Sequence, residues 1–261
     1  MKRAILFPVL MLILASLACG ALPEQAQEPV EAQEEPTMML PTSEISGVGA
    51  SEPTPAVVIE DESTVKEAYD PFDAATEDWS LPYYVTTQAL PGREKSTVEL
   101  KNGTMAFTLM DEETYLYEFY ESMTPEDVLV ETKYQAGGNH TVNGVALICR
   151  AASDLSAWYE FRLGSDTKYS IFRYDVSRRD EGKNPYILLA KGGSQAISPS
   201  KENIVRIQCK GSDLVLEVNG RQVSSVQDGT LTGEGLVGVG AMSYNLTPTY
   251  MMFDYFSYTQ P

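Results

Sequence analysis

The sequence predicts an all-β protein whose main folded part is a two-sheet antiparallel sandwich. From Tyr69 to Pro261 the chain divides into many short runs rich in Val, Ile, Tyr and Phe, separated by Gly, Asp, Asn and Ser. Several runs alternate apolar and polar residues with period two, as "VRIQCKG" does. No segment of helical length carries an apolar stripe with period 3.6. More than ten short strands joined by tight turns favour a sandwich or barrel.

Residues 1–19 have the layout of a secretory signal peptide. Lys2 and Arg3 precede an apolar run from Ile5 to Leu17, which is too short to span a membrane comfortably. The following "SLAC" resembles the bacterial lipobox, in which the cysteine becomes the lipid-bearing first residue, although Ser16 stands where Leu is usual. We therefore expect Cys19 to anchor the protein to a membrane of the bacterial cell envelope, outside the cytoplasm. The alternative is an ordinary cleaved signal with an incidental cysteine.

Residues 20–68 predict a disordered acidic tether. This segment is rich in Pro, Glu, Ala, Ser and Thr, lacks aromatic residues, and has Lys66 as its only base. Such a composition cannot bury enough apolar surface to offset the entropy lost on ordering. Proline and like charge keep the chain extended, so the segment would hold a domain away from the membrane.

The charge balance excludes some classes of function. The formal net charge is −18, and losing the two positive charges of Lys2 and Arg3 with the signal peptide brings it to about −20. An acidic chain of this kind disfavours nucleic acid, whose phosphates need clustered Lys and Arg. His140 is the only histidine, which nearly excludes chemistry that needs two histidine ligands.

The domain spanning 69–261 contains a series of expected strands in chain order. They lie at residues 96–100, 104–110, 114–120, 127–135, 144–151, 157–164, 168–176, 186–192, 203–211, 213–220, 221–228, 235–241 and 249–258. The pair around Asn219 and Gly220 carries the strongest hairpin signal, because Asn-Gly between β runs favours a tight primed turn. "GEGLVG" at 233–238 matches GxGxxG, but the sequence after it predicts strand and loop, so we interpret it as a turn.

The domain resembles, from about Tyr69 to Tyr258, the concanavalin A-like jelly-roll superfamily, and within it the laminin-G-like and keto-disaccharide-hydrolase-like modules. The residues that carry the resemblance are Asn203, Arg206, Gly211, Leu214, Leu216, Asn219, Gly220, Asp228, Gly235, Gly238, Phe253, Asp254 and Phe256. "GVALICRAASDLSAWYEFRLGSDTKYSIFRYD" is also similar to the central part of such modules. The resemblance implies a jelly-roll sandwich, a fold that hosts lectins, hydrolases and adhesion modules alike.

Two cysteines remain if Cys19 carries lipid. An even number outside the cytoplasm suggests one disulfide between Cys149 and Cys209, on strands that would be neighbours or would face each other. The alternative is two buried free thiols.

Aromatic residues give the main indication of a binding site. Sugar-binding sandwiches stack pyranose rings on Tyr and Trp, with Asp, Asn and Arg bonding the hydroxyls. We expect Tyr117, Trp158, Tyr159 and Arg150 to contribute to such a ligand site. The alternative for each aromatic side chain is packing in the core.

The sequence offers few catalytic or metal-binding candidates. Laminarinase-type relatives place two carboxylates with a Glu-x-Asp-x-Glu strand for a retaining mechanism, and no such triplet occurs here. Glu118 and Glu160 are the candidate acid or base residues, the alternative being solvated charges. His and Cys show no metal-ligand spacing. No cofactor is expected, although Asp154, Asp166, Asp175 and Asp180 in turns leave structural calcium open.

Together these features predict a lipid-anchored bacterial surface protein with a non-catalytic glycan-binding or adhesion domain. The alternatives are a glycoside hydrolase of the keto-disaccharide type and a structural or protein-binding envelope component. The sequence does not indicate the ligand, the membrane leaflet or the oligomeric state.

Overall fold

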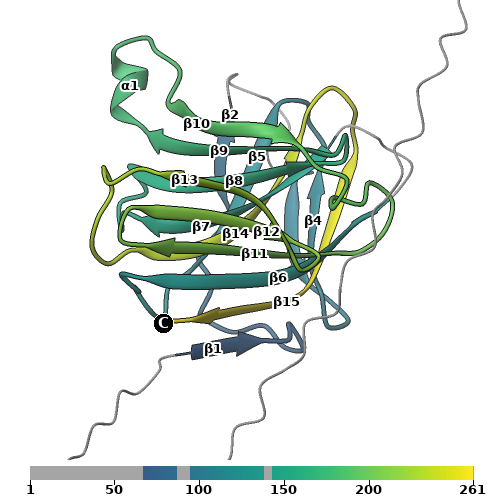
Figure 1. Cartoon of the computed structure of the whole chain (residues 1–261). Coiled ribbons are helices and arrows are strands. Elements are labelled where there is room, and N and C mark those ends of the chain that lie inside the picture. Colours follow the sequence, from purple (N-terminus) through teal and green to yellow (C-terminus); the bar gives the residue numbers. More distant parts are fainter. Residues whose placement is uncertain (1–66, 87–94, 138–142, 261) are drawn as a thin grey trace, which may run out of the picture. The chain divides into compact units, whose positions relative to one another are not determined.

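The computed structural model describes residues 67–86, 95–137 and 143–260 (Figure 1), and all of them belong to one compact unit, Glu60–Pro261. The expected signal peptide, Cys19, most of the tether and His140 lie outside the described residues. The elements are β1 (Glu67–Asp70), β2 (Tyr83–Thr86), β3 (Thr97–Leu100), β4 (Met105–Leu109), β5 (Thr114–Tyr120), β6 (Val128–Gly137), β7 (Asn143–Ala151), β8 (Ala157–Gly164), β9 (Lys168–Asp175), α1 (Ser177–Asp180), β10 (Tyr186–Gly193), β11 (Asn203–Lys210), β12 (Asp213–Val218), β13 (Arg221–Gln227), β14 (Leu236–Ser243) and β15 (Thr249–Thr259).

The strands form two antiparallel sheets that pack as a sandwich, as the sequence predicts. One has eight strands in the order β13-β12-β11-β6-β15-β4-β3, with β1 paired to β15. The other has seven strands in the order β10-β9-β8-β7-β14-β5-β2. Strands close in sequence often lie in different sheets, as β4 and β5 do and as β14 and β15 do. This crossing between layers is the topology of a jelly roll.

Every strand expected from Thr97 onward is present, within two residues of its predicted ends. The Asn-Gly hairpin is also confirmed, because Asn219 and Gly220 have φ values of 51° and 75°, the left-handed pair that the turn requires. "GEGLVG" leads into strand β14. The strands β1 and β2 and the short helix α1 are additional, and β1 begins at Glu67, two residues before the aromatic residues start.

The core between the sheets is built from alternate residues of both layers. On β11 and β12, for example, Val205, Ile207, Leu214 and Leu216 all face inward and are fully buried. Period-two alternation in the sequence therefore corresponds to the inner and outer faces of the sheet. The described residues contain no helix long and apolar enough to cross a membrane.

The predicted disulfide joins the two sheets. Cys149 on β7 and Cys209 on β11 face each other across the core, with their Cα atoms 6.7 Å apart. The strands that carry them are therefore opposed, which is one of the two arrangements that the sequence left open.

Removing this disulfide will lower the free energy of unfolding by about 4 kcal/mol, because the bond closes a loop of 60 residues in the unfolded chain. Chemical denaturation of the Cys149→Ala/Cys209→Ala variant measures the change. Wild-type protein denatured with reductant should match the variant, and a loss below about 1 kcal/mol in both would contradict the prediction.

Candidate functional site

The outer face of the seven-stranded sheet is aromatic, whereas an antiparallel sheet commonly presents polar residues to solvent. Its two central strands, β7 and β14, are buried along their whole length. A second apolar cluster covers their outer face, formed by Val85, Tyr117, Phe119, Ala146, Ile148, Ala151, Trp158, Tyr174, Leu236 and Met242. Alternate residues of strand β8 point to opposite faces of the sheet. Trp158, Glu160 and Arg162 lie on the outer face, whereas Tyr159, Phe161 and Leu163 point into the core between the sheets.

Glu160 lies at the centre of this face and is fully buried. It accepts a hydrogen bond from the Tyr117 hydroxyl at 3.0 Å and one from Trp158 Nε1 at 2.9 Å. Arg162 Nε donates a third at 2.5 Å and forms an ion pair with the carboxylate. With three donors, the buried carboxylate is well satisfied.

Burial and the Glu160 charge both act on the neighbouring groups. Burial raises the pKa of Tyr117 well above its ordinary value, and the Glu160 carboxylate raises it further. Burial is the largest single effect on the pKa of Arg162 and would lower it, but the Coulomb attraction of Glu160, with smaller contributions from Tyr117, Tyr186 and the hydrogen bond to Glu160, raises the pKa overall. Tyr117 therefore stays protonated as a donor, and Arg162 stays cationic.

Glycine on β14 lets the ring of Tyr117 cross the sheet to reach Glu160. Gly240 pairs with Tyr117, and a Cβ atom at Gly240 would lie only 2.4 Å from Cδ1 of that ring. Any larger residue would push the ring away from the sheet. The hydroxyl then reaches from β5 to β8 over the two strands between them.

Aromatic rings surround the guanidinium of Arg162. Its Cζ lies 4.0 Å from the ring centroid of Tyr186 and 4.6 Å from those of Tyr115 and Phe172. Cation–π contacts of this kind hold a guanidinium in place and partly replace its hydration. Beside this group, Trp158 and Tyr174 stack with centroids 3.8 Å apart.

Two clefts open beside Arg162, and both are lined by Arg162 and Phe172. The first has a volume of about 510 Å³ and is also lined by Asn143, Gly164, Ser165, Asp166, Lys168, Tyr169, Ser170, Tyr244 and Asn245. The second has a volume of about 580 Å³ and is also lined by Val85, Tyr115, Arg179, Gly182, Lys183, Asn184, Pro185 and Tyr186. Aromatic rings with amide, hydroxyl and cationic groups suit a polar ligand that has flat apolar faces.

Of the four predicted ligand residues, Tyr117 and Trp158 lie together on this face, but both are fully buried beneath it. They orient Glu160, while the rings of Tyr115, Phe172 and Tyr186 line the clefts.

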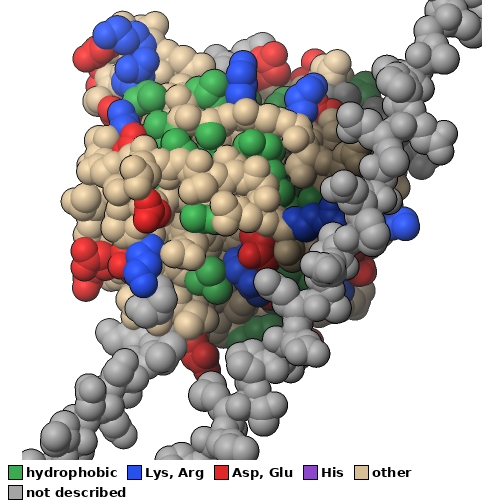
Figure 2. Space-filling model, in the orientation of Figure 1, with side chains coloured by type: hydrophobic (Ala, Val, Ile, Leu, Met, Phe, Trp, Pro, Cys, Tyr) green, Lys and Arg blue, Asp and Glu red, His purple; other side chains and the backbone are tan. Residues whose placement is uncertain are grey.

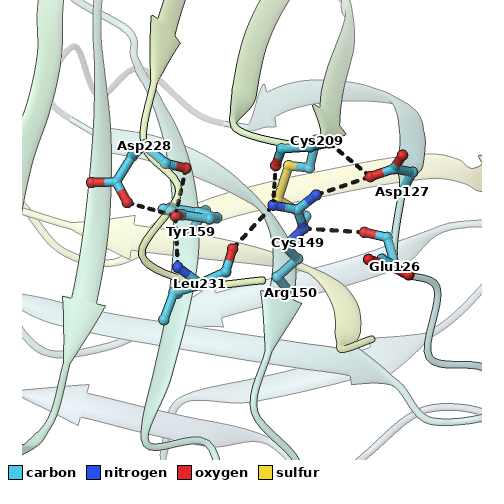
Figure 3. A network of polar contacts seen from close by, with 9 residues as sticks. Glu126, Asp127, Cys149, Arg150, Tyr159, Cys209, Asp228 and Leu231 are labelled. Atoms are coloured by element: carbon cyan, nitrogen blue, oxygen red, sulfur yellow. Dashed lines mark hydrogen bonds and ion pairs between the residues drawn. A yellow bond between two sulfur atoms is a disulfide. The ribbon is translucent and has the colours of Figure 1, made fainter. Parts of the chain in front are cut away.

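Arg150 and Tyr159 lie elsewhere, in a polar network beside the disulfide (Figure 3). Arg150 donates to the carbonyls of Gly211 at 2.5 Å and Leu231 at 3.0 Å, and pairs with Asp127. The Tyr159 hydroxyl donates to Asp228 Oδ1 and accepts from the amide of Leu231. These two side chains line neither cleft, and they brace the loop between β13 and β14.

Glu118 faces the opposite side of the sheet from Glu160. It is 4% exposed and lines a separate, largely apolar cleft of about 290 Å³ with Trp79, Ser80 and Met105 among others. The pKa of Glu118 is raised to about 8, mainly because the carboxyl is buried. A hydrogen bond from Ser80 lowers this pKa, and the nearby charge of Glu121 raises it.

The two candidate carboxylates are therefore not arranged as a catalytic pair. Strands β5 and β8 are separated by β14 and β7, which places their backbones about 14 Å apart at the usual strand spacing. Glycosidases that use two carboxylates hold them about 5–10 Å apart on either side of one bond. Among the described strands of this sheet, Glu160 is the only acidic residue on the outer face, since Glu118 and Asp175 point the other way.

Sequence reasoning missed the cationic residues Arg179 and Lys183, which lie on and just after α1 between β9 and β10. The signal was "SRRDEGK", a basic cluster in an acidic chain, but nothing in the sequence placed it beside the aromatic strands. Within the described ranges, no group of three or more His, Cys, Asp or Glu side chains could hold a metal ion.

Comparison with known proteins shows which solved structures share this fold. No family model and no curated protein sequence matches it. A β-glucanase of Bacillus licheniformis superposes with a TM-score of 0.53 at 13% identity, covering 76% of this chain and 100% of its own. A β-1,3-1,4-glucanase (lichenase) from a mouse hindgut metagenome gives 0.52 at 13% identity, with 74% and 98% covered. A structure described with endo-acting O-glycanases of the human gut microbiota gives 0.54 at 13% identity, with 73% and 97% covered.

These likenesses establish the fold. The domain is a two-sheet jelly roll, the fold that the resemblance of its sequence implied.

Proposed function

We propose that this protein is a surface-anchored bacterial lipoprotein whose sandwich binds glycan without cleaving it. The observation that carries the proposal is the pair of adjoining clefts on the aromatic outer face of the seven-stranded sheet, which share Arg162 and Phe172. Structural neighbours with this fold are named as glucanases and O-glycanases, which act on glycans.

The chemistry of the clefts supports a sugar ligand. Pyranose rings have apolar faces that pack against aromatic rings, and hydroxyl groups that need donors and acceptors. The rings of Tyr115, Phe172 and Tyr244 line the clefts, and Asn184, Ser170 and Asn245 lie beside them. Together the two clefts offer room for more than one sugar unit.

The state of Glu160 supports binding without cleavage. Its carboxylate already accepts three hydrogen bonds, one of them in an ion pair, and is fully buried. A general acid or nucleophile must reach the scissile bond, and a second carboxylate must flank it. Glu160 meets neither requirement in this arrangement.

The support for a lipid anchor to the membrane comes from the sequence. Cys19 in "SLAC" would carry the lipid, and the acidic segment to residue 66 would hold the domain away from the membrane. Several buried acyl chains give stable attachment, at about 0.8 kcal/mol for each CH₂. Labelling with a fatty-acid analogue in a bacterial host tests this, and labelling that persists in Cys19→Ala would contradict it.

Retention on insoluble polysaccharides and affinity electrophoresis test glycan binding. We expect Tyr115→Ala and Tyr244→Ala each to weaken retention about tenfold, because each removes a ring from one cleft. Tyr250→Ala is the matched control, because Tyr250 is 40% exposed on β15 of the other sheet.

Two other results would redirect the assignment. Absence of retention on every polymer would favour a structural or protein-binding envelope component. Release of new reducing ends that Glu160→Gln abolishes would identify a glycoside hydrolase.

A further inference from the structure

The cleft beside α1 has an unusual charge for this protein. Arg162, Arg179 and Lys183 line it, and none of its lining residues is acidic. The chain as a whole carries a formal net charge of −18. Three cations around a cleft of about 580 Å³ therefore stand out against a strongly acidic background.

Arg162 lines this cleft and has unused capacity to donate hydrogen bonds. Only 8% of the residue is exposed, and its Nε is engaged by Glu160. Its Nη2 is buried and has no hydrogen-bond partner among the residues that the structure describes. A buried unpaired donor on a charged group is costly, and an anionic oxygen is the strongest acceptor that could satisfy it.

Arg179 and Lys183 supply cations at the mouth of the cleft. Figure 2 shows Lys and Arg side chains gathered at the upper left, where α1 lies in Figure 1, with acidic side chains beside them. Lys183 pairs with Glu181 at 2.7 Å, but both side chains are 58% exposed, so water and salt weaken the pair. Arg179 is exposed and makes no ion pair with any described carboxylate.

The neighbouring cleft differs. Its lining includes Asp166, which pairs with Lys168 at 2.6 Å, so Arg162 is the only cation in that lining without a carboxylate beside it in the same lining. A neutral part of a ligand suits that cleft, and a negatively charged part suits the cleft beside α1. The two share Arg162, so one extended ligand could occupy both.

We infer that the cleft beside α1 binds the carboxylate or sulfate group of an acidic glycan, held by Arg162, Arg179 and Lys183. This inference rests on the proposed glycan-binding function and names its substrate class. The anionic oxygens would accept hydrogen bonds from the Arg162 guanidinium, while the sugar ring packs on the aromatic rings that line the cleft. Arg179 and Lys183 would close over the anion from the α1 side.

The test uses pairs of polymers that differ only in charge. Polygalacturonate is compared with its carboxyl-reduced form, hyaluronan with its carboxyl-reduced form, and dextran sulfate with dextran, by affinity electrophoresis and calorimetry of the full chain. We expect the wild type to prefer at least one anionic polymer. Arg179→Gln/Lys183→Gln should weaken binding of that polymer about tenfold, and should weaken binding of its uncharged partner much less.

The matched control is Lys210→Gln/Arg221→Gln, which removes the same two charges at exposed positions on the other sheet. Equal weakening in both double variants would show that net charge alone drives retention, and would overturn the inference. Neutral polymers that bind as well as every anionic partner would also overturn it while leaving the proposed function intact. Failure of all polymers, neutral and anionic, would overturn both.

Discussion

Replacing Arg162 by methionine will lower the free energy of unfolding by about 3–5 kcal/mol, because it leaves the Glu160 carboxylate buried without its ion-pair partner. The double variant Glu160→Gln/Arg162→Met should recover most of the loss, since it removes both charges together. Chemical denaturation of the wild type, the two single variants and the double variant gives the coupling energy directly.

Lys168→Met provides the comparison for this cycle. Lys168 forms an ion pair of similar length with Asp166, but the two side chains are 73% and 45% exposed, so the loss should stay below about 1 kcal/mol. If Arg162→Met lowers the free energy of unfolding no more than Lys168→Met does, then Glu160 and Arg162 do not form the buried, water-excluded pair described above.

Glu118 should make the protein less stable as the pH rises. In the folded state burial raises its pKa from 4.5 to about 8, so the folded protein retains a proton that the unfolded chain releases. The contribution of Glu118 to the free energy of unfolding is fully present below about pH 4.5. It falls as the pH rises toward about 8 and is constant above that. At 1.36 kcal/mol for each pKa unit, the loss is as much as about 5 kcal/mol.

Denaturation at pH 5 and pH 9 measures the effect as a difference between variants. Glu118→Gln should remove this part of the pH dependence and make the protein more stable than the wild type at pH 9. Glu99→Gln, at an exposed position on β3, is the control for losing one carboxylate. If the free energy of unfolding changes equally between pH 5 and pH 9 in the wild type and in Glu118→Gln, the raised pKa of Glu118 is contradicted.

The strands were predictable because their signals are local. Residues such as Val205, Ile207 and Leu214 alternate with polar neighbours, and Asn219-Gly220 sets the hairpin. The strands β1 and β2 were not predicted, because "EAYD" and "YYVT" are four residues long and lack a pattern. Pairing with β15 and with β5 makes them strands, and that pairing is a property of the tertiary structure.

The candidate site was only partly predictable, because both faces of the seven-stranded sheet are apolar. Period two shows that Trp158 and Tyr159 point to opposite faces, but it does not show which face packs against the other sheet. The sequence prediction grouped them in one site. It also could not show that Arg150 would pair with backbone carbonyls, since those belong to loops distant in the chain. Arg179 and Lys183 reach the aromatic face only because the connection between β9 and β10 folds beside it.

The pairing of β1 with β15 has a practical consequence for immobilising this domain. Glu67 lies opposite Thr259, so the first residue of β1 and the last residue of β15 lie side by side on the eight-stranded sheet (Figure 1). The two clefts open on the outer face of the seven-stranded sheet, the other layer of the sandwich. A fusion partner, resin or sensor chip attached at either end would therefore leave the clefts facing the solution.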